Sequence, residues 1–83
     1  MYFTYIIYSQ KIDKYYIGYT KDIVRRLERH NNGWSKSTKS GIPWTVKYVK
    51  EFQSKSAAIR FERKLKKQKS RDYLERIINT KNK

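Results

Sequence analysis

Five side chains of this 83-residue sequence have the chemistry needed to hydrolyse a phosphodiester; they are Tyr5, Tyr16, Arg26, His30 and Glu62. An arginine guanidinium stabilises a pentavalent phosphate through two hydrogen bonds, and an imidazole titrates near neutral pH. A tyrosine, with a pKa of about 10, relays a proton or becomes a base where a cation lies close. A lone carboxylate holds a hard divalent cation when water and phosphate complete its shell.

Glu62 is unusual for its surroundings, because it is the only acid in the strongly basic segment 60–71. On a helical wheel the carboxylate falls at the edge of an apolar arc and not on the outer surface. That arc is formed by Ala57, Ala58, Phe61 and Leu65. Two interpretations remain open: a structural salt bridge to Lys66 or Arg63, or a ligand for one divalent metal ion.

The other four residues also have ordinary structural explanations. Arg26 and His30 can be solvated helix residues, one of them paired with Glu28 or Asp22, and a single histidine is more often structural than catalytic. The two tyrosines belong to a chain with eight, so each alone is explained as a strand aromatic. The functional interpretation rests on their combination, and the elements that position them decide whether they meet.

Two stretches rich in Tyr, Ile and Thr predict strands over residues 2–9 and 14–19. The short polar connection between them predicts an antiparallel hairpin in which Ser9 opposes Lys14. In that register Tyr5 opposes Gly18, and Tyr16 lies diagonal to Tyr5 on the same face. A slip of one residue would separate the two rings, because it turns every side chain to the other face.

A helix is expected over residues 21–32, with Thr20 as its N-cap and Gly33 as its stop. The apolar residues expected to pack on the sheet are Ile23, Val24 and Leu27. Arg26 and His30 are four residues apart and flank that apolar stripe. The helix therefore places both polar groups at the border of the core, pointing in nearly the same direction.

The remaining elements are expected to be a loop over 33–43, a strand over 44–52 and helices over 55–68 and 71–79. Ser54 and Ser70 are expected to cap the two helices, and Trp44 is expected in the core. The order β-β-α-β-α-α predicts an α+β fold with a small three-stranded antiparallel sheet flanked by helices. Residues 1–83 are expected to form a single domain, because no linker or repeat divides them.

The charge of the chain predicts a polyanionic partner. Lys and Arg number 21 against seven Asp and Glu, which gives a formal net charge of +14. Nucleic acid is the favoured partner, and an anionic membrane surface is disfavoured because no segment combines a wide apolar face with a lysine-rich one. There is no cysteine and no apolar stretch of about 20 residues, so we expect neither disulfides nor a membrane span. A cytoplasmic protein is the default expectation, with association with the nucleoid as an alternative.

Several residues are expected to contact nucleic acid directly. The loop segment contributes Lys36, Thr38 and Lys39 as phosphate contacts, and its Trp34 is either a core residue or a platform that stacks an unpaired base. Gly18 permits close backbone approach, although a turn explains a strand-end glycine equally well. The basic helix supplies non-specific attraction through Arg63, Lys66 and Lys67.

The order of these residues resembles the GIY-YIG nuclease family over nearly the whole chain. The resemblance is carried by Tyr5, by Tyr16-Ile17-Gly18, by Arg26 and His30 on the next helix, and by Glu62 on a later one. Phe3-Thr4-Tyr5 stands where the name-giving Gly-Ile-Tyr would be, so only its tyrosine is kept. Thr38 and Pro43-Trp44 are similar to the loop of short stand-alone bacterial members and of relatives that cut branched DNA.

The resemblance implies hydrolysis with one metal ion, Mg²⁺ or Mn²⁺. In that scheme Glu62 holds the ion and Arg26 binds the phosphate opposite it. The sequence leaves open whether Tyr5, Tyr16 or His30 activates the water, with a tyrosine favoured. Some relatives also use a late asparagine, for which Asn79 is the candidate here.

The leading hypothesis is therefore a metal-dependent DNA endonuclease of low sequence specificity, selective for DNA structure such as branched, flap or single-stranded DNA. A partner protein is a second source of substrate choice, and repair or recombination is the expected setting. A non-catalytic nucleic-acid-binding module on the same fold is the first alternative, because a fold does not fix a function. RNA as the substrate is the second, because phosphate chemistry and basic charge do not distinguish the two sugars.

Overall fold

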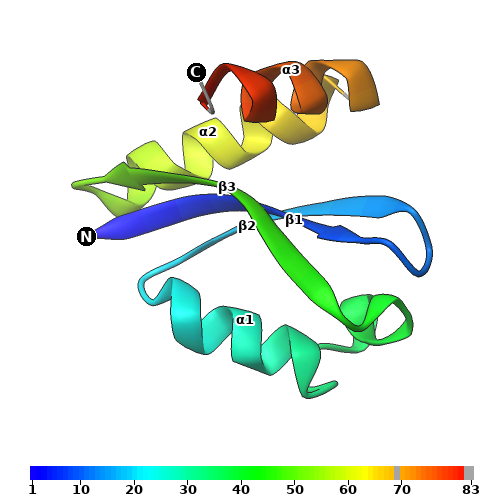
Figure 1. Cartoon of the computed structure of the whole chain (residues 1–83). Coiled ribbons are helices and arrows are strands. Elements are labelled where there is room, and N and C mark those ends of the chain that lie inside the picture. The colour runs from blue at the N-terminus through cyan, green and yellow to red at the C-terminus, as the bar shows by residue number, and fades with distance from the viewer. Residues whose placement is uncertain (69, 82–83) are drawn as a thin grey trace.

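The computed structural model of the chain describes residues 1–68 and 70–81. Figure 1 shows a three-stranded sheet with helices on both faces. The strands are β1 (Tyr2–Ser9), β2 (Lys14–Thr20) and β3 (Trp44–Phe52). The helices are α1 (Ile23–Asn31), the short 3₁₀ helix η1 (Lys36–Gly41), α2 (Lys55–Gln68) and α3 (Arg71–Lys81). The predicted α+β class and the element order β-β-α-β-α-α are confirmed.

The sheet is antiparallel throughout, in the order β2-β1-β3. Ser9 opposes Lys14 and Tyr5 opposes Gly18, which is the predicted hairpin register. Asp13 adopts a positive φ of 53°, which tightens the connection at its end. Since β1 is the central strand, its side chains alternate between the two faces of the sheet.

The two faces are covered by different helices. In Figure 1, α1 lies on one face, and α2 and α3 lie together on the other. The core beneath α2 and α3 is apolar and is formed by Ile6, Ile17, Leu65, Leu74 and Ile78. The core on the α1 side is formed by Tyr5, Ile7 and Trp44, with Tyr16, Ile23 and Leu27 packed against it. Trp44 is buried, as the sequence predicted.

Helix α1 begins later than the sequence suggested. Asp22, not Thr20, is its N-cap, and the Asp22 carboxylate accepts a hydrogen bond from the Arg25 backbone N–H at 3.0 Å. Thr20 instead extends β2 by one residue and accepts a bond from the Asp22 backbone N–H. An aspartate at this position satisfies the first free amide groups of the helix better than threonine does.

Three other local expectations change. The segment expected to be a loop contains η1, and α3 continues two residues past Asn79. Val24, expected to pack on the sheet, is 67% exposed, because the buried side of α1 is narrower than its apolar pattern. The caps of the later helices are as predicted: Ser54 accepts from the Ala57 backbone N–H, and Ser70 accepts from that of Tyr73. Among the described residues, no helix is both long and apolar enough to cross a bilayer.

Candidate active site

A cleft of about 500 Å³ opens beside the edge strand β2, where α1 and α2 approach from opposite faces of the sheet. Four of the five candidate residues line it: Tyr5 from β1, Tyr16 from β2, Arg26 from α1 and Glu62 from α2. The other lining residues are Tyr2, Gly18, Tyr19, Thr20, Lys21 and Lys55. The fold therefore gathers side chains that are up to 60 positions apart in the sequence around one space.

The fifth candidate, His30, lies behind Tyr5 and does not line the cleft. The His30 ring is buried, and its Nε2 is 3.0 Å from the Tyr5 hydroxyl. Its Nδ1 is 2.8 Å from the hydroxyl of Thr38, in η1. Tyr16 packs edge-on against the same imidazole, with ring centroids 5.2 Å apart. The histidine is thus held on both nitrogens, and Tyr5 separates it from the open space.

The contacts of Thr38 favour one tautomer of His30. The Thr38 hydroxyl lies 3.3 Å from the Ser35 carbonyl and 2.8 Å from His30 Nδ1. Donation of its single proton to the carbonyl leaves its oxygen to accept from His30 Nδ1–H, and we assign the proton of the ring to Nδ1 on this basis. With the proton on Nδ1, the neutral ring has a free lone pair on Nε2. In this tautomer the Tyr5 hydroxyl, 3.0 Å from Nε2, donates to that lone pair, which leaves the lone pairs of its own oxygen available on the cleft side.

Burial shifts both partners toward their neutral forms. It raises the pKa of Tyr5 to about 12, although the nearby Arg26 guanidinium opposes part of the increase. Burial also lowers the pKa of His30, and the positive charges of Arg26 and Arg29 lower it further. At neutral pH the pair is therefore an uncharged phenol hydrogen-bonded to an uncharged imidazole.

Gly18 is required by the position of the Tyr5 ring. A Cβ atom at Gly18 would lie 2.5 Å from the Tyr5 hydroxyl oxygen and 2.8 Å from its Cζ. Both distances are far below van der Waals contact, so any larger residue would displace the ring. The glycine of the Tyr16-Ile17-Gly18 run therefore has a physical role: it lets the tyrosine of the neighbouring strand lie across the β2 backbone.

Arg26 and Glu62 face the cleft from the two opposing helices. Arg26 Nη1 donates weakly to the Tyr19 carbonyl at 3.4 Å, which orients the guanidinium along the cleft edge. Glu62 is mostly buried, with a side-chain exposure of 14%, and Lys66 Nζ lies 3.5 Å from its Oε2. The predicted salt bridge to Lys66 is present, but Lys66 is half exposed. The ion pair uses Oε2 of Glu62 and does not involve Oε1.

The donor set suits a divalent ion bound mainly by water and substrate. Glu62 is the carboxylate that lines the cleft, and no group of three metal-binding side chains occurs among residues 1–68 and 70–81. A hard ion such as Mg²⁺ keeps several waters and is often held by one or two carboxylates together with phosphate oxygens. The chemistry of this site fits such an ion.

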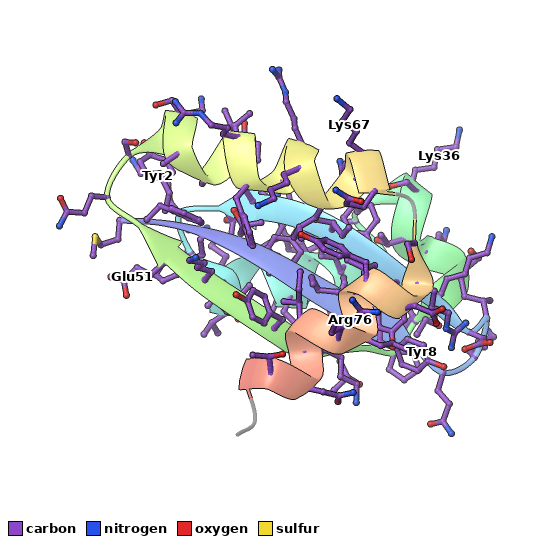
Figure 2. All side chains as sticks on the ribbon, turned by 90° about the horizontal axis from the view of Figure 1, so that it is seen from above. Tyr2, Tyr8, Lys36, Glu51, Lys67 and Arg76 are labelled. Atoms are coloured by element: carbon purple, nitrogen blue, oxygen red, sulfur yellow. The ribbon has the colours of Figure 1, made fainter. Side chains whose placement is uncertain are left out.

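The residues expected to contact nucleic acid fall into two groups. Lys36, Lys39, Arg63, Lys66 and Lys67 are exposed, and Figure 2 shows Lys36 and Lys67 projecting outward from η1 and α2, away from Glu51. Thr38 differs from the expectation, because it is fully buried and its hydroxyl is used by His30. No surface remains on Thr38 for a phosphate contact.

Sequence reasoning missed five polar or cationic groups of the cleft, namely Tyr2, Tyr19, Thr20, Lys21 and Lys55. The parity of β1 gave no signal for Tyr2, because a residue three positions from Tyr5 points to the opposite face of the strand. Neither lysine had any signal in a chain with 21 basic residues. Asn79 is exposed on α3 and lines a separate hollow with β3, so it does not line the cleft.

Comparisons with known proteins agree with this arrangement. The family model described as the GIY-YIG catalytic domain matches residues 1–80. A UPF0213 protein of Halobacterium salinarum is 43% identical over 53 residues, which are 63% of this chain and 69% of that protein. A UPF0213 protein of Streptococcus pneumoniae is 45% identical over 56 residues, 66% of this chain and 57% of that protein.

A solved structure is similar over almost the whole chain. The solution NMR structure of a UPF0213 protein from Bacillus halodurans matches with a TM-score of 0.61 and 31% identity. The match covers 98% of this chain and 86% of the other. The sequence and the fold therefore lead to the same group of small proteins.

Proposed function

This chain belongs to the GIY-YIG catalytic domain family, and on that premise we propose that it is a metal-dependent endonuclease that hydrolyses phosphodiester bonds in DNA with low sequence specificity. One observation carries the proposal. Tyr5, Tyr16, Arg26 and Glu62 come from four separate elements and face a single cleft large enough for a phosphate and its surrounding waters. A structural explanation for each residue alone does not account for this convergence.

Arg26 and Glu62 have complementary roles in the proposal. Arg26 binds the scissile phosphate and stabilises the charge that develops on its oxygens. Glu62 holds one Mg²⁺ or Mn²⁺ on the opposite side of the cleft. When bound, such an ion supplies charge neutralisation at the phosphate and at the leaving oxygen. Because Glu62 and Arg26 are on different helices, the substrate lies between α1 and α2.

Tyr5 activates the attacking water, with His30 as the final proton acceptor. The Tyr5 oxygen takes a proton from water while its own hydroxyl proton passes to His30 Nε2, 3.0 Å away. A tyrosine with a pKa of about 12 is a poor base at neutral pH, and the transfer to His30 removes the need for a free phenolate. Tyr16 positions the imidazole from its edge, so Tyr5 is the better candidate for the immediate base.

The charge of +14 supports a polyanionic substrate but does not select DNA over RNA. Matched DNA and RNA strands of one sequence, in single-stranded, duplex, flap and four-way-junction forms, test the substrate directly. Each substrate is incubated with Mg²⁺, with Mn²⁺ and with EDTA. We expect metal-dependent cleavage of DNA, with little dependence on sequence and a preference among the structures.

Glu62→Gln tests the mechanism, because it removes the charge and keeps the shape. We expect cleavage to fall by at least about 100-fold, while circular dichroism and thermal unfolding remain close to those of the parent protein. Glu51→Gln is the matched control, because Glu51 is an exposed glutamate on β3 that does not line the cleft. Unchanged cleavage by Glu62→Gln would overturn the mechanism. Tight binding with no cleavage of any substrate would instead support the non-catalytic binding module.

A further inference from the structure

One aromatic side chain on the surface is not used by the proposed chemistry. Trp34 is 70% exposed, whereas Trp44, the other tryptophan of the chain, is 5% exposed. Among the described residues the other large exposed hydrophobic side chains are Met1 and Val24. The face of this indole is available to a ligand, and what the ligand would be depends on the residues around it.

The backbone holds Trp34 at a defined place at the end of α1. Gly33 has a φ of +78°, a conformation that glycine adopts without strain, and it turns the chain out of the helix. The Trp34 backbone N–H then donates to the Arg29 carbonyl at 3.0 Å. The indole is therefore attached to an ordered helix end and not to a free loop.

Trp34 forms one wall of a second hollow, of about 430 Å³, whose other walls are cationic. Arg25, Arg29, Arg26 and Lys21 line it, and none of the four forms an ion pair within the part of the chain that the structure describes. The single acid in its lining, Asp22, is already used as the N-cap of α1. The hollow thus combines one aromatic face with unpaired positive charge.

This hollow adjoins the cleavage cleft. Thr20, Lys21 and Arg26 line both spaces, and Arg26 is the residue to which we assign the scissile phosphate. The two spaces therefore offer a strand bound at Arg26 a continuous path over Lys21 toward Arg25, Arg29 and Trp34. Along that path the guanidinium groups are available to neighbouring phosphates, and the indole is available to a base.

We propose that Trp34, with Arg25 and Arg29, is a nucleic-acid subsite that stacks one unpaired base of the substrate strand next to the cleavage cleft. The proposal rests on the proposed function, and it defines the substrate as nucleic acid with a single-stranded segment beside the scissile phosphate. Stacking on an aromatic face needs a base that is out of its duplex, and it tolerates any base identity. Selection by local single-strandedness is therefore compatible with low sequence specificity.

Binding in the absence of metal separates this subsite from the chemistry. A labelled duplex with a short single-stranded oligothymidylate overhang, whose duplex end fixes the register of the bound strand, is titrated with the full chain in EDTA, where no hydrolysis occurs. The same strand is then made with a single abasic position, moved one nucleotide at a time, and a duplex of equal length is the third probe. We expect the abasic substitution to weaken binding about 5- to 100-fold at one position, and much less elsewhere.

Two variants assign that effect to Trp34. Trp34→Ala should bind the intact and the abasic strand equally, and Trp34→Phe should keep most of the discrimination because it keeps an aromatic face. Val24→Ala is the control, because Val24 is an equally exposed apolar residue on the neighbouring helix α1. Arg29→Ala should weaken all probes together and reduce the salt dependence of binding.

The outcomes are distinguishable from those of the cleavage assay. Position-dependent loss that requires Trp34 supports the subsite even if no metal permits cleavage. Cleavage-competent protein in which Trp34→Ala leaves the affinity of every probe unchanged overturns the subsite and leaves the proposed function standing. Trp34-dependent binding to anionic phospholipid vesicles, with no difference between intact and abasic strands, would assign the indole to a membrane surface and overturn the subsite.

Discussion

The two faces of the sheet are built on different principles. The face under α2 and α3 is apolar apart from the hydrogen-bonded Thr4, with Ile6, Leu65 and Leu74 at its centre. The face under α1 buries Tyr5, His30 and Thr38 beside its apolar residues, linked by hydrogen bonds into one chain. No buried polar side-chain atom of the described residues lacks a hydrogen-bond partner, so hydrogen bonds compensate for the desolvation of Tyr5, His30 and Thr38.

The difference teaches where stability and chemistry are located. Apolar burial stabilises the fold in proportion to the area removed from water, whereas a saturated polar network mainly specifies one geometry. We therefore expect substitutions beneath α2 to lower the free energy of unfolding and leave cleavage by the folded protein intact. Substitutions beneath α1 should impair cleavage more than they impair folding.

The largest expected effect on stability is that of Leu65→Ala. Leu65 is 1% exposed in the core beneath α2, so its truncation leaves a cavity and should lower the free energy of unfolding by about 3 kcal/mol. Guanidinium denaturation followed by circular dichroism measures this change. Cleavage per folded molecule should stay near that of the parent, although Glu62 is on the same helix. Lys64→Ala, at the exposed neighbouring position, is the control and should change stability by less than about 0.5 kcal/mol.

Gly18→Ala should have a smaller effect on stability and a larger one on chemistry. The added methyl group collides with the Tyr5 ring, and relief of such overpacking costs about 1–3 kcal/mol. Because Tyr5 must move away from His30, we expect Gly18→Ala to reduce the cleavage rate by about as much as Tyr5→Phe does. The assay compares both variants with Lys14→Ala, an exposed change on the same strand. Full activity in Gly18→Ala would show that the position of Tyr5 is not critical.

The third effect appears at acidic pH and belongs to His30, the single histidine of the chain. Its pKa in the folded protein lies below the ordinary value of 6.5, so the unfolded chain takes up the proton first as the pH falls. The free energy of unfolding should therefore decline as the pH drops below 6.5. His30→Gln should remove this part of the pH dependence in denaturation curves.

Cleavage has the same sign of pH dependence, because a protonated His30 cannot accept from Tyr5. The rate should fall as the pH drops through the lowered pKa of His30. A rate that rises toward acidic pH would contradict the assignment of His30 as proton acceptor. This outcome would contradict the assignment of the chemistry to the sheet face under α1.

The smallest effect should be that of Asp13→Asn, at the surface. The Arg71 guanidinium is 2.6 Å from the Asp13 carboxylate and holds its pKa down at about 2, below the usual 3.8, with help from the Tyr8 hydroxyl. The stabilisation is therefore present above pH 3.8 and is lost as the pH falls toward 2. Denaturation midpoints of the variant and the parent should differ slightly at neutral pH and converge in acid, with cleavage unchanged. A marked loss of cleavage would show that the hairpin end affects the site.

Much of the fold was accessible from local sequence patterns. The strand periods, the Ser54 and Ser70 caps and the parity of the hairpin were enough to place Tyr5 opposite Gly18. The start of α1 was not, because Thr20 and Asp22 are both good caps and β2 competes for the threonine. The exposure of Val24 depends on how narrow the contact of α1 with the sheet is, which no local pattern records.

The sequence predicted which residues gather at the candidate site better than it predicted how deeply each of them is buried. Residue type and order brought together Tyr5, Arg26 and Glu62, which the structure places around one cleft. Sequence alone did not show that His30 lies behind Tyr5, or that Thr38 is its buried partner. That depth depends on η1 folding over the end of α1, a long-range packing arrangement between segments whose sequences suggest only a helix and a loop.

The central position of β1 has a consequence for how the site opens. Thr4 and Ile6 face α2, where the Thr4 hydroxyl donates to the Ala58 carbonyl at 2.8 Å, while Tyr5 lies between them on the opposite face. Both edges of this strand are paired, so its amide hydrogens should exchange with solvent only when the whole domain unfolds. The residue that we assign to water activation therefore shares its backbone with the slowest-opening part of the protein. Local fluctuations of the surrounding loops can therefore admit a substrate without displacing Tyr5.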